Sequence, residues 1–291
     1  MFPPSFDYHS PSTLAEAVAL LGRLGEDAKV LSGGQSLLPL MKLRLSQPAH
    51  LVDIGRIPGL EGLEEKDGVL RIGARTREAA LERSELVQRR YPLLADAVAV
   101  IADPLVRNLA TVGGNLAHGD PANDHPAVML AYGAKVIAVG PKGSRELPID
   151  GFFTSLFTTA LRPDEILTEI RIPVPPERSG GAYLKLERKV GDFATAAAAV
   201  QLSLGARGEV LRAGIGLTNA GPTPVKAREA EQWLVGKALD DGTIAEAARL
   251  AAKASSPTAD RRGTVEYKRA MARVLTARAL RLAAERAKGG R

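Results

Sequence analysis

The sequence contains no cysteine among its 291 residues. Disulfide bonds, cysteine-ligated zinc and cysteine-ligated iron–sulfur clusters are therefore excluded from this chain. Histidine is scarce as well, and the four are His9, His50, His118 and His125. None of them forms a His-x-x-x-His or His-Glu-x-x-His pattern. The sequence therefore predicts no metal site in the protein.

Long apolar runs are also missing. No run approaches the roughly 18 residues that a membrane-spanning helix needs. The first ten residues contain two prolines and two serines and lack the basic-then-apolar order of a signal peptide. We therefore expect no membrane span and a cytoplasmic location, with peripheral attachment at the inner membrane face as an alternative.

The chain has an excess of positive charge, and this excess is concentrated near the C-terminus. The formal net charge is +6, and residues 261–291 alone hold ten Lys or Arg against two Glu. Alanine and leucine recur between these arginines, which is typical of a helix with one solvated face and one packed face. An acidic protein partner is a weaker interpretation and nucleic acid the weakest. We therefore predict no nucleic-acid binding.

Apolar periodicity predicts a mixed α+β chain. Helices are expected at 14–24, about 93–101, 124–131, 227–238, 243–254 and 264–287. Strands are expected at 28–31, 51–54, 60–64, 69–74, 134–139, 166–174, 182–188, 194–204 and 209–217. Thr13 and Glu16 form a capping box at the first helix.

Two domains are expected, because a proline run followed by small residues covers 173–181. The first is residues 1–177, with parts at about 1–55 and 56–177. The second is residues 178–291, an antiparallel sheet with helices behind it.

Two glycine pairs are the most informative motifs. The first, Ser32-Gly33-Gly34-Gln35-Ser36, follows a predicted buried strand, and the second is Thr111-Val112-Gly113-Gly114-Asn115. Glycine lets a ligand approach backbone N–H groups closely, and a diphosphate needs many such donors. Each pair alone is equally consistent with a tight turn. Together they predict one ligand held from two sides.

Two carboxylates follow the second pair. Asp120 and Asp124 could accept hydrogen bonds from ribose or ribityl hydroxyls. Asp124 also precedes a predicted helix, so capping of that helix is the alternative, and both roles can coexist.

Other familiar motifs fail. The chain has no Gly-x-x-x-x-Gly-Lys-[Ser/Thr] phosphate loop and no Gly-x-Ser-x-Gly nucleophile elbow. Gly214-Ile215-Gly216 begins like a dinucleotide fingerprint but lacks the third glycine and lies inside a predicted strand. We interpret it as a strand packed closely on a neighbour.

The two glycine motifs, with Asp120-Pro121 and Asp124, resemble the FAD-binding signatures of the xanthine dehydrogenase/molybdenum hydroxylase flavoprotein family. The likeness covers nearly the whole chain, including the segments 183–194 and 260–263, and it is greatest to the carbon monoxide-oxidising branch. The resemblance implies a two-part FAD-binding domain of the vanillyl-alcohol-oxidase/PCMH type. An antiparallel sheet with helices would follow it.

The resemblance also implies which residues bind FAD. They are Lys29, Val30, Leu31, Ser32, Gly33, Gly34, Gln35, Ser36, Leu37, Thr111, Gly113, Gly114, Asn115, Asp120, Asp124, Leu167, Lys185 and Phe193. The run 29–37 would follow the diphosphate and adenosine side, and Asp124 would hold hydroxyls. Lys185 would approach the polar edge of the flavin, where a positive group stabilises an anionic reduced ring. Phe193 stands where related chains often have tyrosine. No catalytic residue is implied.

The implied function is electron transfer. Electrons would pass from [2Fe–2S] clusters on a small subunit to FAD on this chain, and then to an external acceptor. A large subunit would carry molybdopterin and oxidise the substrate, and the assembly would be a dimer of heterotrimers. We expect the isolated chain to bind FAD poorly, because no lid is evident over the glycine motifs. Two alternatives remain: an FAD subunit acting with a purine, N-heterocycle or aldehyde dehydrogenase, and a non-catalytic nucleotide-binding scaffold.

Overall fold

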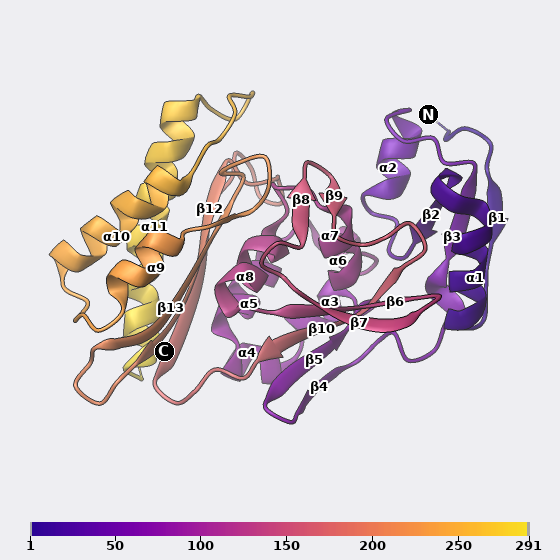
Figure 1. Ribbon diagram of the computed structural model, residues 1–291. Helices are drawn as coiled ribbons and strands as arrows, with labels where there is room; N and C mark the ends of the chain where they lie inside the picture. The colour runs from indigo at the N-terminus through magenta and orange to yellow at the C-terminus, as the bar shows by residue number, and fades with distance from the viewer. Residues whose placement is uncertain (1, 290–291) are drawn as a thin grey trace.

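The computed structural model describes residues 2–289, and the chain begins with a small parallel sheet (Figure 1). Its strands are β1 (Asp7–His9), β2 (Ala28–Leu31) and β3 (His50–Asp53), in the order β1-β3-β2. α1 (Leu14–Leu24) packs on this sheet, and α2 (Leu37–Lys42) follows the first glycine motif. The predicted cap is confirmed in part. Thr13 accepts from Glu16 N, but the Glu16 carboxylate accepts from Ser12 N and not from Thr13 N.

A five-stranded antiparallel sheet forms the middle of the molecule. Its order is β4 (Leu63–Lys66), β5 (Val69–Gly73), β10 (Ile166–Pro173), β6 (Lys135–Gly140) and β7 (Gly143–Pro148). A small hairpin, β8 (Phe153–Ser155) and β9 (Thr158–Thr159), lies beside it. The helices of this section are α3 (Glu78–Glu82), α4 (Glu85–Arg90), α5 (Pro92–Ala99), α6 (Pro104–Arg107), α7 (Val112–His118) and α8 (Asp124–Tyr132). Apolar side chains of α3, α4, α5, α7 and α8 share one core with β5 and β10.

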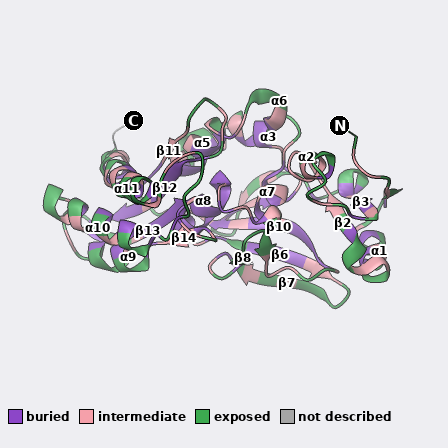
Figure 2. Ribbon diagram, turned by 90° about the horizontal axis from the view of Figure 1, so that it is seen from above, coloured by how far each residue is buried: buried purple, intermediate pink, exposed green. Residues whose placement is uncertain are grey.

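The last sheet lies between two layers of helices (Figure 1). Its strands are β11 (Ser179–Leu186), β12 (Ala196–Leu204), β13 (Val210–Thr218) and β14 (Val225–Lys226), in chain order. α9 (Arg228–Leu234), α10 (Asp241–Ala254) and α11 (Val265–Ala287) cover one face, and α5 and α8 pack on the other. Residues on both faces of β12 are therefore buried, as the colours of Figure 2 show. This explains its run of four alanines, which let helices approach from both sides.

Glycines set the distance between this sheet and α8. A Cβ on Gly214 would lie 2.8 Å from the carbonyl carbon of Ala131, and one on Gly216 would lie 2.9 Å from Ala127 Cα. Both are inside ordinary van der Waals contact. The interpretation of this segment as a closely packed strand is therefore confirmed.

The basic C-terminal helix also follows its expected pattern. Leu280 and Ala283 of α11 are fully buried, whereas Arg273 and Arg278 are exposed. Among residues 2–289, no helix is both long and apolar enough to cross a bilayer.

Several elements differ from the sequence-based expectation. The segment 173–181 is not all linker, because β11 already begins at Ser179. β1 was not predicted, since its three residues are mostly exposed and gain order only by pairing with β3. The second glycine pair lies inside α7 and not in a loop. Glycine disfavours helix by about 1 kcal/mol relative to alanine, so its presence there depends on tertiary contacts.

A candidate cofactor site between the glycine motifs and the C-terminal sheet

The two glycine motifs touch each other in the structure. The hydroxyl oxygens of Ser32 and Thr111 are 3.0 Å apart and share a hydrogen bond. A Cβ on Gly33 would lie 2.9 Å from Ala110 Cα and closer still to the carbonyl oxygen of Leu109. Only glycine therefore allows the first motif to lie against the chain that leads into the second.

The first motif turns sharply from β2 into α2. Gly34 has a φ of +74°, in the left-handed region that favours glycine. Ser36 precedes α2 but makes no side-chain cap bond with it, and the Gln35 amide donates only a long 3.4 Å bond to Gly33 O. The polar side chains of Gln35 and Ser36 therefore make few hydrogen bonds within the protein, which fits a site for a phosphate-bearing ligand.

The polar groups of the second motif form more hydrogen bonds within the protein. Thr111 accepts from Gly114 N at 3.3 Å, and Gly113 N donates to Ala74 O at 2.9 Å. A Cβ on Gly113 would lie 2.5 Å from Ala74 Cβ. The expectation that both glycines offer free N–H groups does not match this geometry, because Gly113 N donates to Ala74 and Gly114 N donates to Thr111. The role of Gly113 is close packing, which holds Thr111 against Ser32.

Asn115 lies in α7, and Asp120 lies in the stretch between α7 and α8. The Asn115 carbonyl accepts from Asn123 Nδ2 at 2.9 Å, and Asp120 Oδ1 accepts from Ala122 N at 2.8 Å. The side-chain oxygen Asn115 Oδ1 is buried and has no partner among the described residues. Buried polar atoms are nearly always paired, so this orphan fits a missing ligand group.

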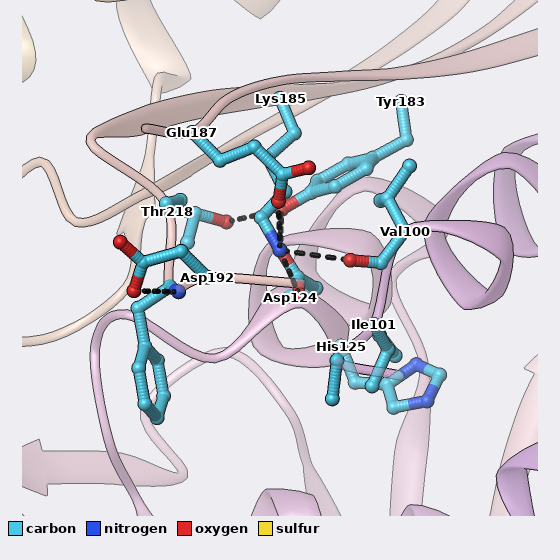
Figure 3. A network of polar contacts seen from close by, with 12 residues as sticks. Val100, Ile101, Asp124, His125, Tyr183, Lys185, Glu187, Asp192 and Thr218 are labelled. Atoms are coloured by element: carbon cyan, nitrogen blue, oxygen red, sulfur yellow. Dashed lines mark hydrogen bonds and ion pairs between the residues drawn. The ribbon is translucent and has the colours of Figure 1, made fainter. Parts of the chain in front are cut away.

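A second group of polar residues lies where α8 meets β11 (Figure 3). Asp124, the first residue of α8, accepts from Tyr183 Oη at 2.6 Å and from Lys185 Nζ at 3.0 Å. Lys185 Nζ also donates to Val100 O at 2.9 Å and lies 3.4 Å from a Glu187 oxygen. Burial raises the pKa of Asp124, and the charge of Lys185 opposes that rise.

These contacts change the expected role of Asp124. Its residue is 6% exposed, and both carboxylate oxygens are used by Tyr183 and Lys185. It therefore anchors Lys185, and the expectation that it holds cofactor hydroxyls does not match this geometry. The sequence pattern missed Tyr183, Glu187 and Val100, because their meeting depends on the packing of β11 against α8 and the segment after α5.

Phe193 lies in the loop after β11, and a network of ion pairs fixes that loop. Asp192 accepts from Phe193 N at 2.8 Å, from Arg262 at 2.8 Å and from Arg188 at 2.9 Å. The Arg262 guanidinium, followed by Arg188, lowers the pKa of Asp192 to about 2. Phe193 itself is 47% exposed, with the Arg262 guanidinium 5.9 Å from its ring centroid. A half-exposed aromatic ring held this firmly is suited to stacking on a planar ligand.

Five predicted positions lie apart from these contacts. Leu167 is buried in β10 opposite Ala138. Lys29 is an exposed residue of β2, and Val30 and Leu31 continue that strand beside β3. Leu37 opens α2.

A further pair stands fully buried between the two groups. His125 Nε2 lies 2.7 Å from Glu78 Oε2, and both side chains are 0% exposed. Burial alone lowers the pKa of His125, but Glu78 and Asp124 more than offset this, so the pKa is raised. Within the described part of the chain, no group of three His, Asp or Glu is placed to hold a metal ion.

Family models match nearly the whole chain. The model described as the FAD binding domain in molybdopterin dehydrogenase matches residues 4–175. The model described as the CO dehydrogenase flavoprotein C-terminal domain matches residues 181–283.

Individual proteins match over their full length. The carbon monoxide dehydrogenase medium chain of Hydrogenophaga pseudoflava is 48% identical, over 97% of this chain and 98% of its own. The 6-hydroxypseudooxynicotine dehydrogenase complex subunit alpha of Paenarthrobacter nicotinovorans is 38% identical, over 99% and 97%. A solved structure of reconstituted CO dehydrogenase from Oligotropha carboxidovorans matches with a TM-score of 0.96 and 47% identity, over 98% of this chain and 100% of that one.

Proposed function

The chain belongs to the flavoprotein family of the molybdopterin dehydrogenases, and from this membership we propose that it is the FAD-carrying electron-transfer subunit of a carbon monoxide dehydrogenase. It takes electrons from [2Fe–2S] clusters on a partner and passes them through FAD to an external acceptor. The observation that carries the proposal is the bond between Ser32 and Thr111, which joins two motifs 79 residues apart into one site. The 48% identity to the medium chain of H. pseudoflava, which extends over 97% of this chain, supports carbon monoxide as the substrate of the complex.

When bound, FAD supplies the redox chemistry, and the chain supplies binding and orientation. The joined motifs, with Ser32, Ser36 and Thr111, hold the diphosphate. The unpartnered Asn115 Oδ1 accepts from a cofactor group. Phe193 covers the ring, and Lys185, with one N–H not spent on Asp124 or Val100, reaches its polar edge.

The remaining predicted positions take supporting parts in this proposal. Lys29, Val30 and Leu31 form the strand that leads into the first motif, and Gln35 and Leu37 flank it. Asp120 shapes the chain between the motifs and α8. Asp124 holds Lys185 in place, and Leu167 packs beneath the site.

The partners follow from what the chain lacks. It has no cysteine with which to bind an iron–sulfur cluster, so the clusters must lie on another chain. We place them on a small subunit and molybdopterin on a large one, in a dimer of heterotrimers. The domain boundary near residue 177 and the cytoplasmic location stay predictions.

A second candidate is an FAD subunit of a dehydrogenase for an N-heterocycle, a purine or an aldehyde. The 38% identity to a subunit named for 6-hydroxypseudooxynicotine dehydrogenase favours it. Carbon monoxide remains the first choice because the identity to the medium chain is higher.

The test uses the chain purified with its partner subunits. We expect a yellow complex with flavin absorbance bands that bleach under carbon monoxide without another donor. Bleaching by a heterocycle or an aldehyde, but not by carbon monoxide, would establish the second candidate. A complex without flavin would leave only the scaffold interpretation.

A further inference from the structure

Lys185 is a buried cation at the place where the side chains of α8 and β11 meet, and two carboxylates lie close to its ammonium group. Its side chain is 3% exposed, and Asp124 Oδ2 lies 3.0 Å and Glu187 Oε2 3.4 Å from Nζ. One ammonium therefore stands between two carboxylates. Tyr183 adds no charge, because its neutral hydroxyl group donates a hydrogen bond to Asp124.

Glu187 is the carboxylate that makes the net charge of this group negative. Its side chain is 19% exposed, and Oε2 is buried without a hydrogen-bond partner among the described residues. Asp124, by contrast, is paired at both oxygens. The inner group of Lys185, Asp124 and Glu187 thus carries a formal charge of −1 when its carboxylates are ionised.

Other charged groups nearby form ion pairs of their own. Asp192 is paired with Arg188 and Arg262, whose side chains are 51% and 24% exposed. Water reduces the field of such groups more than that of buried ones. The buried Glu78 and His125 lie 2.7 Å apart, and their formal charges cancel when both are ionised.

We propose that Glu187 is the residue that sets the charge at the flavin end of the site, and so lowers the reduction potential of the bound FAD. The inference rests on the proposed function and deepens it. It also replaces the expectation that Lys185 presents a net positive charge to the reduced ring. The sequence shows only the lysine, whereas the structure places the carboxylates of Asp124 and Glu187 beside it.

The chemistry of reduction explains the direction. Two electrons arrive from the partner's iron–sulfur clusters, together with one or two protons from solvent. With one proton the reduced ring is an anion, and with two it is neutral. A carboxylate beside the ring disfavours the anion and disfavours the gain of electrons.

The experiment compares Glu187→Gln with wild type in the assembled complex. Glutamine keeps the size and removes the charge. We expect the equilibrium constant for two-electron reduction to rise about tenfold, which is about 30 mV for a two-electron couple. The pH at which reduced FAD gains its second proton should fall, as followed by absorbance.

Glu285→Gln is the matched control, because Glu285 is an exposed residue of α11 and the charge change is the same. Glu187→Asp should stay near wild type. A change of less than threefold in Glu187→Gln, a change in the opposite direction, or loss of FAD in that variant alone would overturn the proposal. A wild-type complex without FAD would instead overturn the proposed function.

Discussion

At the scale of single residues, the contact between Gly33 and the Leu109–Ala110 backbone leaves no room for a side chain. We predict that Gly33→Ala separates the two motifs and lowers FAD affinity by more than tenfold. The reason is that the added Cβ would meet backbone atoms, which cannot rotate away. Equilibrium dialysis or flavin fluorescence of the purified complex measures the affinity.

Gly22→Ala is the control for that variant. Gly22 lies in α1, and a Cβ there has nothing within 4 Å. FAD affinity equal in both variants would contradict the assignment of Gly33 to the site.

The buried pair of Glu78 and His125 gives a second prediction at this scale. His125→Leu should lower the free energy of unfolding by about 3 kcal/mol, because it leaves Glu78 buried without its partner. Glu78→Leu/His125→Leu removes both charges and should cost clearly less. Urea unfolding of the two variants checks this, and equal losses would argue against the pair.

The pair also predicts a pH dependence. The folded-state pKa of His125 is raised, so its contribution is fully present below the unfolded value of about 6.5. The contribution is lost as pH rises through the folded-state value. Wild-type stability should therefore fall towards alkaline pH relative to the doubly substituted chain. Parallel pH profiles for the two proteins would show that His125 is not protonated in the folded state.

Sequence reasoning reached some of these residues and not others. The sequence predicts that the two glycine motifs hold one ligand, because both combine a glycine pair with polar residues, but it does not predict the bond between Ser32 and Thr111. The role of Asp124 could not be predicted, since its partners Tyr183 and Lys185 lie 59 and 61 residues away. Only the packing of α8 on β11 shows that the carboxylate is already satisfied.

At the scale of elements, the packing of α8 on β13 depends on missing side chains. Gly216→Ala should lower the free energy of unfolding by about 3 kcal/mol, because its Cβ would press on the Ala127 backbone. Gly22→Ala should instead raise stability by up to about 1 kcal/mol, since it removes a glycine from an open helix position. Thermal unfolding of both variants tests the two predictions. If Gly216→Ala leaves the stability unchanged, α8 can move away from β13 at little cost.

Long periodic elements were predictable and short ones were not. The strands of the C-terminal sheet and α11 follow from their apolar pattern alone. α7 did not, because Gly113 and Gly114 read as a loop. Its helical form depends on Thr111 as the cap, which is a local contact, and on Ala74, which lies far away in the sequence.

At the scale of the whole molecule, an ion pair ties α11 to α5. Arg286 donates to both oxygens of Asp96, at 2.6 and 3.1 Å, and to Gly181 O at 2.6 Å. With α5 and α8 packed on the C-terminal sheet, we predict a single unfolding transition for both halves. Trp233, the only tryptophan, reports on the C-terminal half and far-ultraviolet circular dichroism on the whole chain. The two curves should coincide.

Arg286→Met should lower the transition midpoint, at a cost of about 1 to 2 kcal/mol for this partly exposed bidentate pair. Arg281→Met is the control, because Arg281 pairs with an Asp241 side chain that is 89% exposed. Separate curves for the two probes in the wild-type chain would contradict the single transition.

The same ion pair has a consequence for how the chain is made. Asp96 and Arg286 are 190 residues apart, and ribosomes add roughly 5 to 20 residues each second. Some 10 to 40 s therefore pass between the synthesis of the two ends of the pair. In the early part of that interval, before residues 179–218 with β11, β12 and β13 have been made, α5 and α8 lack the sheet that later covers them. The nascent chain thus presents an uncovered apolar face early, and this interval is when a chaperone could bind it.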